Sequence, residues 1–108
     1  MGESKLYNTL RLEAVKYGCI LLRNNSGCLQ DKRGQYVRYG VANPGGADLI
    51  GWTQRHGVAV FTAVEVKTAK GKLTATQAAF LAAVQTSGGI AGVVRSVDDL
   101  RALLGRMR

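Results

Sequence analysis

Residues 61–77 read FTAVEVKTAKGKLTATQ, and the first half of this stretch predicts a buried strand. With the residues before it, the apolar run extends over 58–67. Glu65 lies inside that run. Because side chains alternate along a strand, Glu65 and Lys67 share one face, while the valines on either side of Glu65 occupy the other. A lone carboxylate among apolar side chains is costly, so Glu65 needs a partner.

The rest of the chain predicts an α/β domain around this strand. Apolar spacing and turn residues predict, in chain order, a helix over 3–17, strands over 19–25, 36–41, 47–52 and 58–67, a helix over 75–87, a strand over 90–96 and a helix over 97–107. Residues 26–35 are predicted as a loop or turn. A helix between the strands at 58–67 and 90–96 allows them to pair in parallel. We therefore expect a single domain over residues 1–108, with a central mixed β-sheet flanked by helices.

The charge of the chain indicates a polyanionic partner. It has 108 residues and a net charge of +8, with 15 Lys and Arg against 7 Asp and Glu. A pI near 10.0 in a small domain is typical of nucleic-acid binding. Because the basic residues are spread along the sequence, we expect them on a face of a folded domain and not in a disordered tail.

Several classes of protein are disfavoured by the composition. Cys19 and Cys28 form no Cys-x-x-Cys pair, and His56 is the single histidine, so the chain offers no Cys/His zinc site of its own. We expect two free thiols. The N-terminal residues lack the apolar segment of a signal peptide, and no apolar run approaches the roughly 20 residues of a membrane span. We expect a soluble intracellular protein without a membrane partner.

A second carboxylate, Asp48, begins the strand predicted at 47–52. If this strand and 58–67 form a hairpin that turns near residues 56 and 57, residue 48 pairs near residue 65. Two neighbouring carboxylates repel one another unless a cation neutralises them. Mg²⁺ binds one or two carboxylates and keeps waters, so it can activate a water and stabilise charge on a phosphate. Lys67 could orient that water or neutralise the developing charge.

Ordinary structural roles stay open for the same residues. Asp48 could be an acid at a strand entry after a Gly-Gly turn, and Glu65 and Lys67 could form an ion pair on a half-exposed face.

Asp48, Glu65 and Lys67 also resemble the motif of a known protein family. Gly46-Ala47-Asp48 followed by Glu65-Val66-Lys67 resembles the PD…(D/E)xK nuclease signature, with Ala47 where that motif has its proline. The wider sequence closely resembles stand-alone phage and bacterial members of the virus-type replication-repair nuclease (VRR-Nuc) family. The matching segments span nearly the whole chain and are RNNSG at 23–27, RYGVANPGGADLIG at 38–51, FTAVEVKTAKGKLTATQAAFL at 61–81 and GGIAGVVRS at 88–96.

The resemblance implies a restriction-endonuclease-like core and a metal-dependent phosphodiesterase with Mg²⁺ or Mn²⁺ and no organic cofactor. It implies Asp48, Glu65, the Val66 carbonyl and Glu3 as metal ligands, with Lys67 and Gln77 as further catalytic residues. It also implies action on branched, Holliday-junction-like DNA in replication or repair, as a homodimer. The compartment would be the cytoplasm of a bacterium or of a phage-infected cell.

Other site residues have alternatives of their own. Gln77 also completes a capping box with Thr74, and Glu3 also suits a helix N-terminus. The candidate contacts to nucleic acid could instead be solvated loop residues. They are Lys70 and Lys72 after the strand, and Arg23, Asn24, Asn25, Lys32, Arg33 and Arg38 around a hairpin that could reach into a duplex. Trp52 and Phe80 are expected in the core rather than as platforms for stacked bases.

The first hypothesis is therefore a metal-dependent DNA endonuclease selective for DNA structure. The alternative is a basic nucleic-acid-binding module without catalysis, in which Glu65 and Lys67 are a structural ion pair. A nuclease acting on RNA is a third possibility, since no residue pattern distinguishes 2′-hydroxyl recognition.

Overall fold

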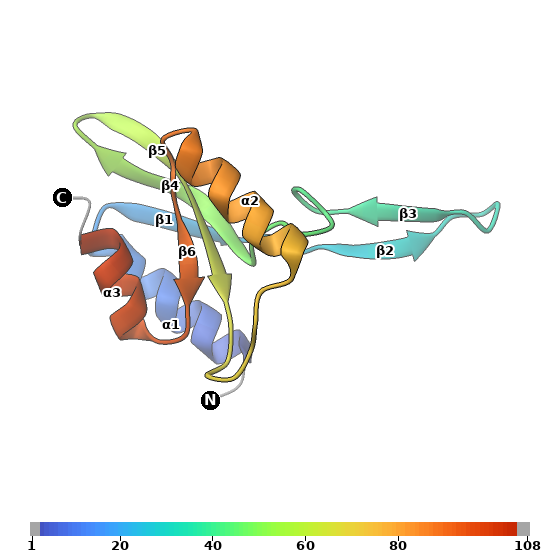
Figure 1. Ribbon diagram of the computed structural model, residues 1–108, viewed down its shortest axis with the longest axis horizontal. Coiled ribbons are helices and arrows are strands. Elements are labelled where there is room, and N and C mark those ends of the chain that lie inside the picture. Colours follow the sequence, from blue (N-terminus) through green and yellow to red (C-terminus); the bar gives the residue numbers. More distant parts are fainter. Residues whose placement is uncertain (1–2, 106–108) are drawn as a thin grey trace.

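The computed structural model describes residues 3–105, except for the side chain of Glu3. Its elements, drawn in Figure 1, are α1 Glu3–Val15, β1 Cys19–Arg23, β2 Gly27–Gln30, β3 Tyr36–Tyr39, β4 Leu49–Arg55, β5 Val58–Val66, α2 Ala75–Thr86, β6 Ile90–Val94 and α3 Val97–Gly105. The order of helices and strands agrees with the sequence prediction, apart from β2.

Four strands form the central sheet in the order β1-β4-β5-β6. β1, β4 and β5 pair antiparallel, and β5 pairs with β6 in parallel through the α2 crossover, so the sheet is mixed as expected. The β4–β5 hairpin turns on His56 and Gly57, whose φ angles of 52° and 77° are both positive. This two-residue turn suits the twist of paired strands, and it lets β4 continue to Arg55 instead of ending at residue 52.

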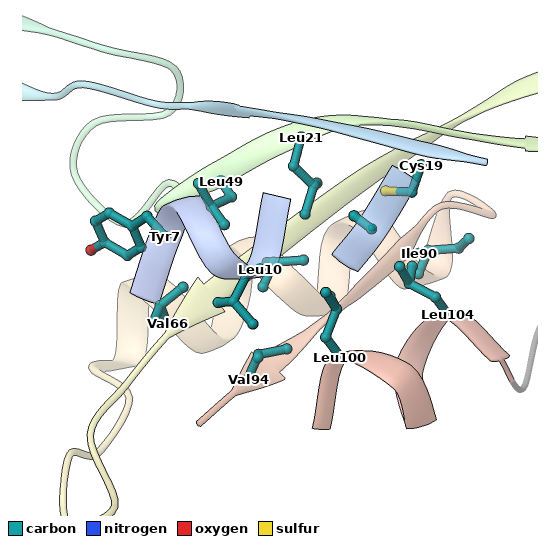
Figure 2. Close-up of a cluster of buried hydrophobic side chains, with 12 residues drawn as sticks. Tyr7, Leu10, Cys19, Leu21, Leu49, Val66, Ile90, Val94, Leu100 and Leu104 are labelled. Carbon is teal, nitrogen blue, oxygen red and sulfur yellow. The ribbon is translucent and has the colours of Figure 1, made fainter. Parts of the chain in front are cut away.

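The two faces of the sheet carry different cores. α1 and α3 cover one face, where Leu10, Leu49, Leu100 and Leu104 are fully buried (Figure 2). α2 packs on the other face against small side chains, among them Ala63. Because residues alternate along β5, the valines beside Glu65 point to the first core and Glu65 points to the α2 side.

Residues at the helix ends explain where the helices begin and end. The Ser96 hydroxyl accepts a hydrogen bond from Asp99 N at 3.2 Å and caps α3, as expected for an N-cap serine. Gly18 and Gly88 follow α1 and α2 with φ of 71° and 95°, a conformation that glycine adopts without strain.

β2 and β3 form a separate two-stranded sheet, the arm, that projects from the body of the molecule (Figure 1). The prediction of a loop over 26–35 is wrong for Gly27–Gln30, which pairs antiparallel with β3. This segment was missed because both of its faces are exposed, so it has no alternation of apolar and polar residues.

Trp52 is 43% exposed, which corrects the expectation that it lies in the core, whereas Phe80 packs against the α2-side core. Trp52 pairs with Ile20 on one side and with Phe61 on the other. These three side chains form an exposed apolar row across β1, β4 and β5. α2 contacts only β5 and β6 closely, so the row stays uncovered.

Cys19 is buried, Cys28 is exposed, and both are free thiols as expected. Within the part of the chain that the structure describes, no helix is long and apolar enough to cross a membrane.

Candidate active site

Asp48 and Glu65 meet where β4 begins and β5 ends. The hairpin pairs Leu49 with Val64, and the same register puts residue 48 opposite residue 65, as the sequence predicted. The Val66 amide donates a hydrogen bond to Asp48 Oδ2 at 2.8 Å. The Asp48 carboxylate is therefore held against the strand that carries Glu65.

Glu65 is a buried carboxylate with incomplete pairing. The residue is only 2% exposed. Its Oε1 lies 3.8 Å from the Lys67 Nζ and accepts a long hydrogen bond of 3.4 Å from the Gln77 Nε2. Its Oε2 is buried and has no hydrogen-bond partner among the described residues. Buried polar atoms are almost always paired, so this oxygen points to a missing ligand.

The electrostatics of the pair favour a neutral Glu65 when no cation is present. Burial is the main cause that raises the pKa of Glu65, to about 8, and the neighbouring Asp48 raises it further. Lys67 opposes both effects, but it is too weak a partner at 3.8 Å to cancel them. Two adjacent carboxylates with one distant ammonium form a site that a divalent cation would stabilise.

The donor set fits Mg²⁺ or Mn²⁺. Among the residues whose side chains the structure describes, no three His, Cys, Asp or Glu side chains lie close enough together to hold a metal ion. Mg²⁺ does not require one, since it binds through one or two carboxylates and keeps several waters. The N–H and C=O of one strand residue point to the same neighbouring strand, so the Val66 carbonyl is on the Asp48 side. The side chain of Glu3, the fourth expected ligand, lies outside the described residues.

The contacts of Gln77 fit both of the roles that the sequence left open. Thr74 and Gln77 form the predicted capping box at the N-terminus of α2, in which Thr74 N donates to Gln77 Oε1 at 3.0 Å. The same side chain donates from Nε2 to Glu65. The helix cap thus positions the Gln77 side-chain amide beside the buried Glu65 carboxylate.

The loop between β5 and α2 carries Lys70 and Lys72, both exposed. Arg95 fixes this loop, because its guanidinium donates to the carbonyls of Thr68 and, at 2.7 Å, of Gly71. No local sequence pattern predicts this role of Arg95, because its partners are more than twenty residues away in the chain.

Asn24, expected as a contact to nucleic acid, has a structural role beside the site that the sequence did not predict. Its backbone amide donates to Asp48 O at 2.8 Å. Its side-chain amide donates to the carbonyls of Ala47 and Val41, each at 3.0 Å, and its Oδ1 accepts from Val41 N at 2.9 Å. Asn24 therefore holds the segment that presents Asp48.

The remaining predicted contacts to nucleic acid are not all beside the carboxylates. Arg23 ends β1, pairs with Leu49 in the register and lies over the Tyr7 ring at 4.5 Å from its centroid. Asn25 is exposed just beyond it, and Arg38 lies on the arm, outside the central sheet. The structure thus brings together Asp48, Glu65, Lys67 and Gln77, whereas the Arg23 side chain lies on the α1 face and Arg38 lies on the arm.

Comparison with known proteins identifies the family. The model of the VRR-NUC domain matches residues 5–98, which is most of the chain. No curated protein and no solved structure gives a significant match. The matched segment includes all four residues gathered at the site and the whole central sheet. The chain therefore belongs to the VRR-NUC domain family, which has a PD-(D/E)XK-like nuclease fold and whose membership indicates a nuclease.

Proposed function

We propose that this protein is a metal-dependent endonuclease that hydrolyses phosphodiester bonds in DNA. The observation that carries the proposal is the buried Oε2 of Glu65, which has no partner in the described structure and lies beside Asp48. Mg²⁺ or Mn²⁺ held by Asp48, Glu65 and the Val66 carbonyl would supply Lewis-acid stabilisation of the charge that develops on the phosphate. No organic cofactor is required for this reaction.

The protein's own residues would orient the reaction. Lys67 extends from the strand end with its side chain 19% exposed, so its ammonium can reach a phosphate oxygen or the attacking water while its stem stays packed. Its positive charge opposes the negative charge that grows in the transition state. Gln77 keeps the Glu65 carboxylate in one orientation through the helix cap.

The cations around the site support DNA as the substrate. Lys70 and Lys72 lie in the loop that Arg95 fixes, on one side of the carboxylates. Arg23 and Asn25 lie at the end of β1, which pairs with the opposite edge of β4; the Arg23 side chain packs over the Tyr7 ring on the α1 face. A DNA backbone that crosses the site would meet the positive charge of the loop, which is the usual way in which phosphates are positioned.

We also propose that the protein acts as a homodimer on branched DNA in replication or repair. The exposed row of Ile20, Trp52 and Phe61 supports the dimer, because it is apolar and carries no charge that would suit a phosphate backbone. A two-fold dimer would present two sites to a two-fold DNA junction. A solution mass equal to one chain would contradict the dimer, and Trp52→Glu should convert a dimer to single chains.

The experiment that tests the function is cleavage of a labelled four-way junction, a flap and a plain duplex with Mg²⁺, with Mn²⁺ and with EDTA. We expect metal-dependent cutting that is lost in Glu65→Gln and in Lys67→Ala. Glu13→Gln is the matched control. Glu13 is also a buried glutamate, but it pairs with Arg101 and Lys16 between α1 and α3.

The alternatives are separated when DNA binding in EDTA is measured and an RNA substrate is added beside the three DNA substrates. Tight DNA binding in EDTA with no cutting in either metal would favour a binding module without catalysis. Cutting of RNA but not of DNA would mean that the protein is a nuclease acting on RNA. Equal cutting of all three DNA substrates would contradict selectivity for branched structures.

A further inference from the structure

The arm is exposed to solvent along most of its length. From residue 28 to residue 39 every residue is exposed. Leu29 and Val37 are 64% and 51% exposed, although they are opposite one another in the register. A two-stranded hairpin alone is marginally stable in water. The arm therefore has the character of a surface that meets a partner.

The base of the arm is fixed to the candidate active site. The Asn43 side chain donates to the carbonyls of Gly27 and Tyr39 at 2.7 and 2.8 Å, which joins the two strands where they leave the body. The chain then runs through Gly45, where an added Cβ would lie 2.8 Å from the Thr76 carbonyl in the first turn of α2. Asn24 holds the same segment next to Asp48. The direction of the arm is thus set relative to the catalytic residues.

The charge of the arm is positive and unpaired. Residues 27–39 contain Lys32, Arg33 and Arg38 and a single acid, Asp31. The Asp31 carboxylate is occupied by the turn, since it accepts from Arg33 N at 2.9 Å and from Gln35 N at 2.8 Å. None of the three cations forms an ion pair in the described structure.

We propose that the arm grips the double-stranded DNA next to the bond that is cut, so that the substrate must carry a duplex beside the cleavage point. This rests on the proposed nuclease function and deepens it. The major groove of B-DNA admits a two-stranded ribbon, and the segment from Gly27 at the base to Arg33 at the tip spans at most about 20 Å when extended. Lys32 and Arg33 at the tip would contact phosphates, while Arg38 and Tyr36 face the groove from one side of the ribbon.

A second copy of the chain is the competing partner. Leu29, Val37 and Tyr39 share the other side of the ribbon and could pack on another protein. DNA is favoured because each copy carries a net charge of +8, and because the charged tip is the part of the arm furthest from the body (Figure 1).

The test uses Lys32→Gln/Arg33→Gln in the full chain, with Lys5→Gln/Lys16→Gln as a control that removes the same charge from exposed positions on α1 and just after it, where Lys16 pairs with Glu13. Binding of a labelled duplex and of one of its single strands is measured by fluorescence anisotropy in EDTA over a range of salt concentrations. We expect duplex binding about 10- to 60-fold weaker at 0.1 M salt for the arm variant, and a salt slope reduced by about 2, because two phosphate contacts are lost. The α1 control and the single strand should change little.

Three results would overturn the proposal. They are unchanged duplex affinity in the arm variant, an equal loss on the single strand, and a fall of the solution mass to one chain in Val37→Ser with duplex binding intact. The arm is tested by binding alone, in EDTA, where no cleavage takes place. If the wild type never cuts DNA, the proposed nuclease function is contradicted, but the binding measurement still tests the arm.

Discussion

The burial of Glu65 predicts that the metal-free protein loses stability as the pH rises. The perturbation is Glu65→Gln, which keeps the size of the side chain and removes its titration. The folded pKa of about 8 lies above the ordinary value of 4.5. A group of this kind stabilises the fold fully below pH 4.5, and its contribution falls as the pH rises toward and through 8.

The magnitude follows from the difference between the two pKa values. At about 1.36 kcal/mol for each pH unit, the difference corresponds to a loss on the order of 4 kcal/mol between pH 5 and pH 9. A domain of this size is typically stable by about 5–15 kcal/mol, so the loss should be large enough to see. Burial also raises the pKa of the Cys19 thiol, but that group is present in both proteins and cancels in the comparison.

The assay is urea unfolding in EDTA at several pH values from 5 to 9, followed by far-ultraviolet circular dichroism. The wild type should lose stability with rising pH, and Glu65→Gln should show a much smaller loss. Adding Mg²⁺ at pH 8.5 should recover part of the loss in the wild type and little in the variant, since a ligand that binds only the folded state stabilises it. Equal pH slopes in the two proteins would refute the reasoning.

Three further predictions concern single side chains. Lys67→Ala should lower cleavage by about 100-fold or more with an unchanged circular dichroism spectrum, because the charge acts in the transition state; retained cleavage would remove Lys67 from the mechanism. Thr74→Ala and Gln77→Ala should each cost about 1 kcal/mol in urea unfolding through the cap, but only Gln77→Ala should also lower the cleavage rate, since only Gln77 contacts Glu65. Leu100→Ala, at a fully buried position between α3 and the sheet, should cost about 2–5 kcal/mol of unfolding free energy in the same assay, and a cost below 1 kcal/mol would mean that this core is loosely packed.

The parts of the fold that the sequence predicted are those with local periodicity. The alternation along β5 identified which face Glu65 takes, and the length of the turn at His56 and Gly57 fixed the register that brings Asp48 opposite it. The capping box of Thr74 and Gln77 predicted where α2 begins. These features depend on residues close together in the chain, so a single sequence can reveal them.

β2 and Trp52 show where that reasoning fails. Gly27–Gln30 forms a strand although neither of its faces is buried, so the period-2 signal is missing. Trp52 alternates correctly, yet it stays exposed because α2 covers β5 and β6 and leaves β1 and β4 open. Which half of a sheet face is covered depends on where a distant helix packs, and no local pattern encodes that.

The candidate site divides in the same way. By itself, the sequence predicted that Asp48, Glu65 and Lys67 meet on a hairpin and that Gln77 caps a helix start, because spacing and register are local properties; the catalytic role of Gln77 was implied only by the resemblance to the family. Tertiary structure alone decided that Glu65 Oε2 is buried without a described partner, that Asn24 holds the Asp48 segment and that Arg95 fixes the basic loop. Those contacts join residues far apart in the chain, and they exist only once the sheet and its helices have packed.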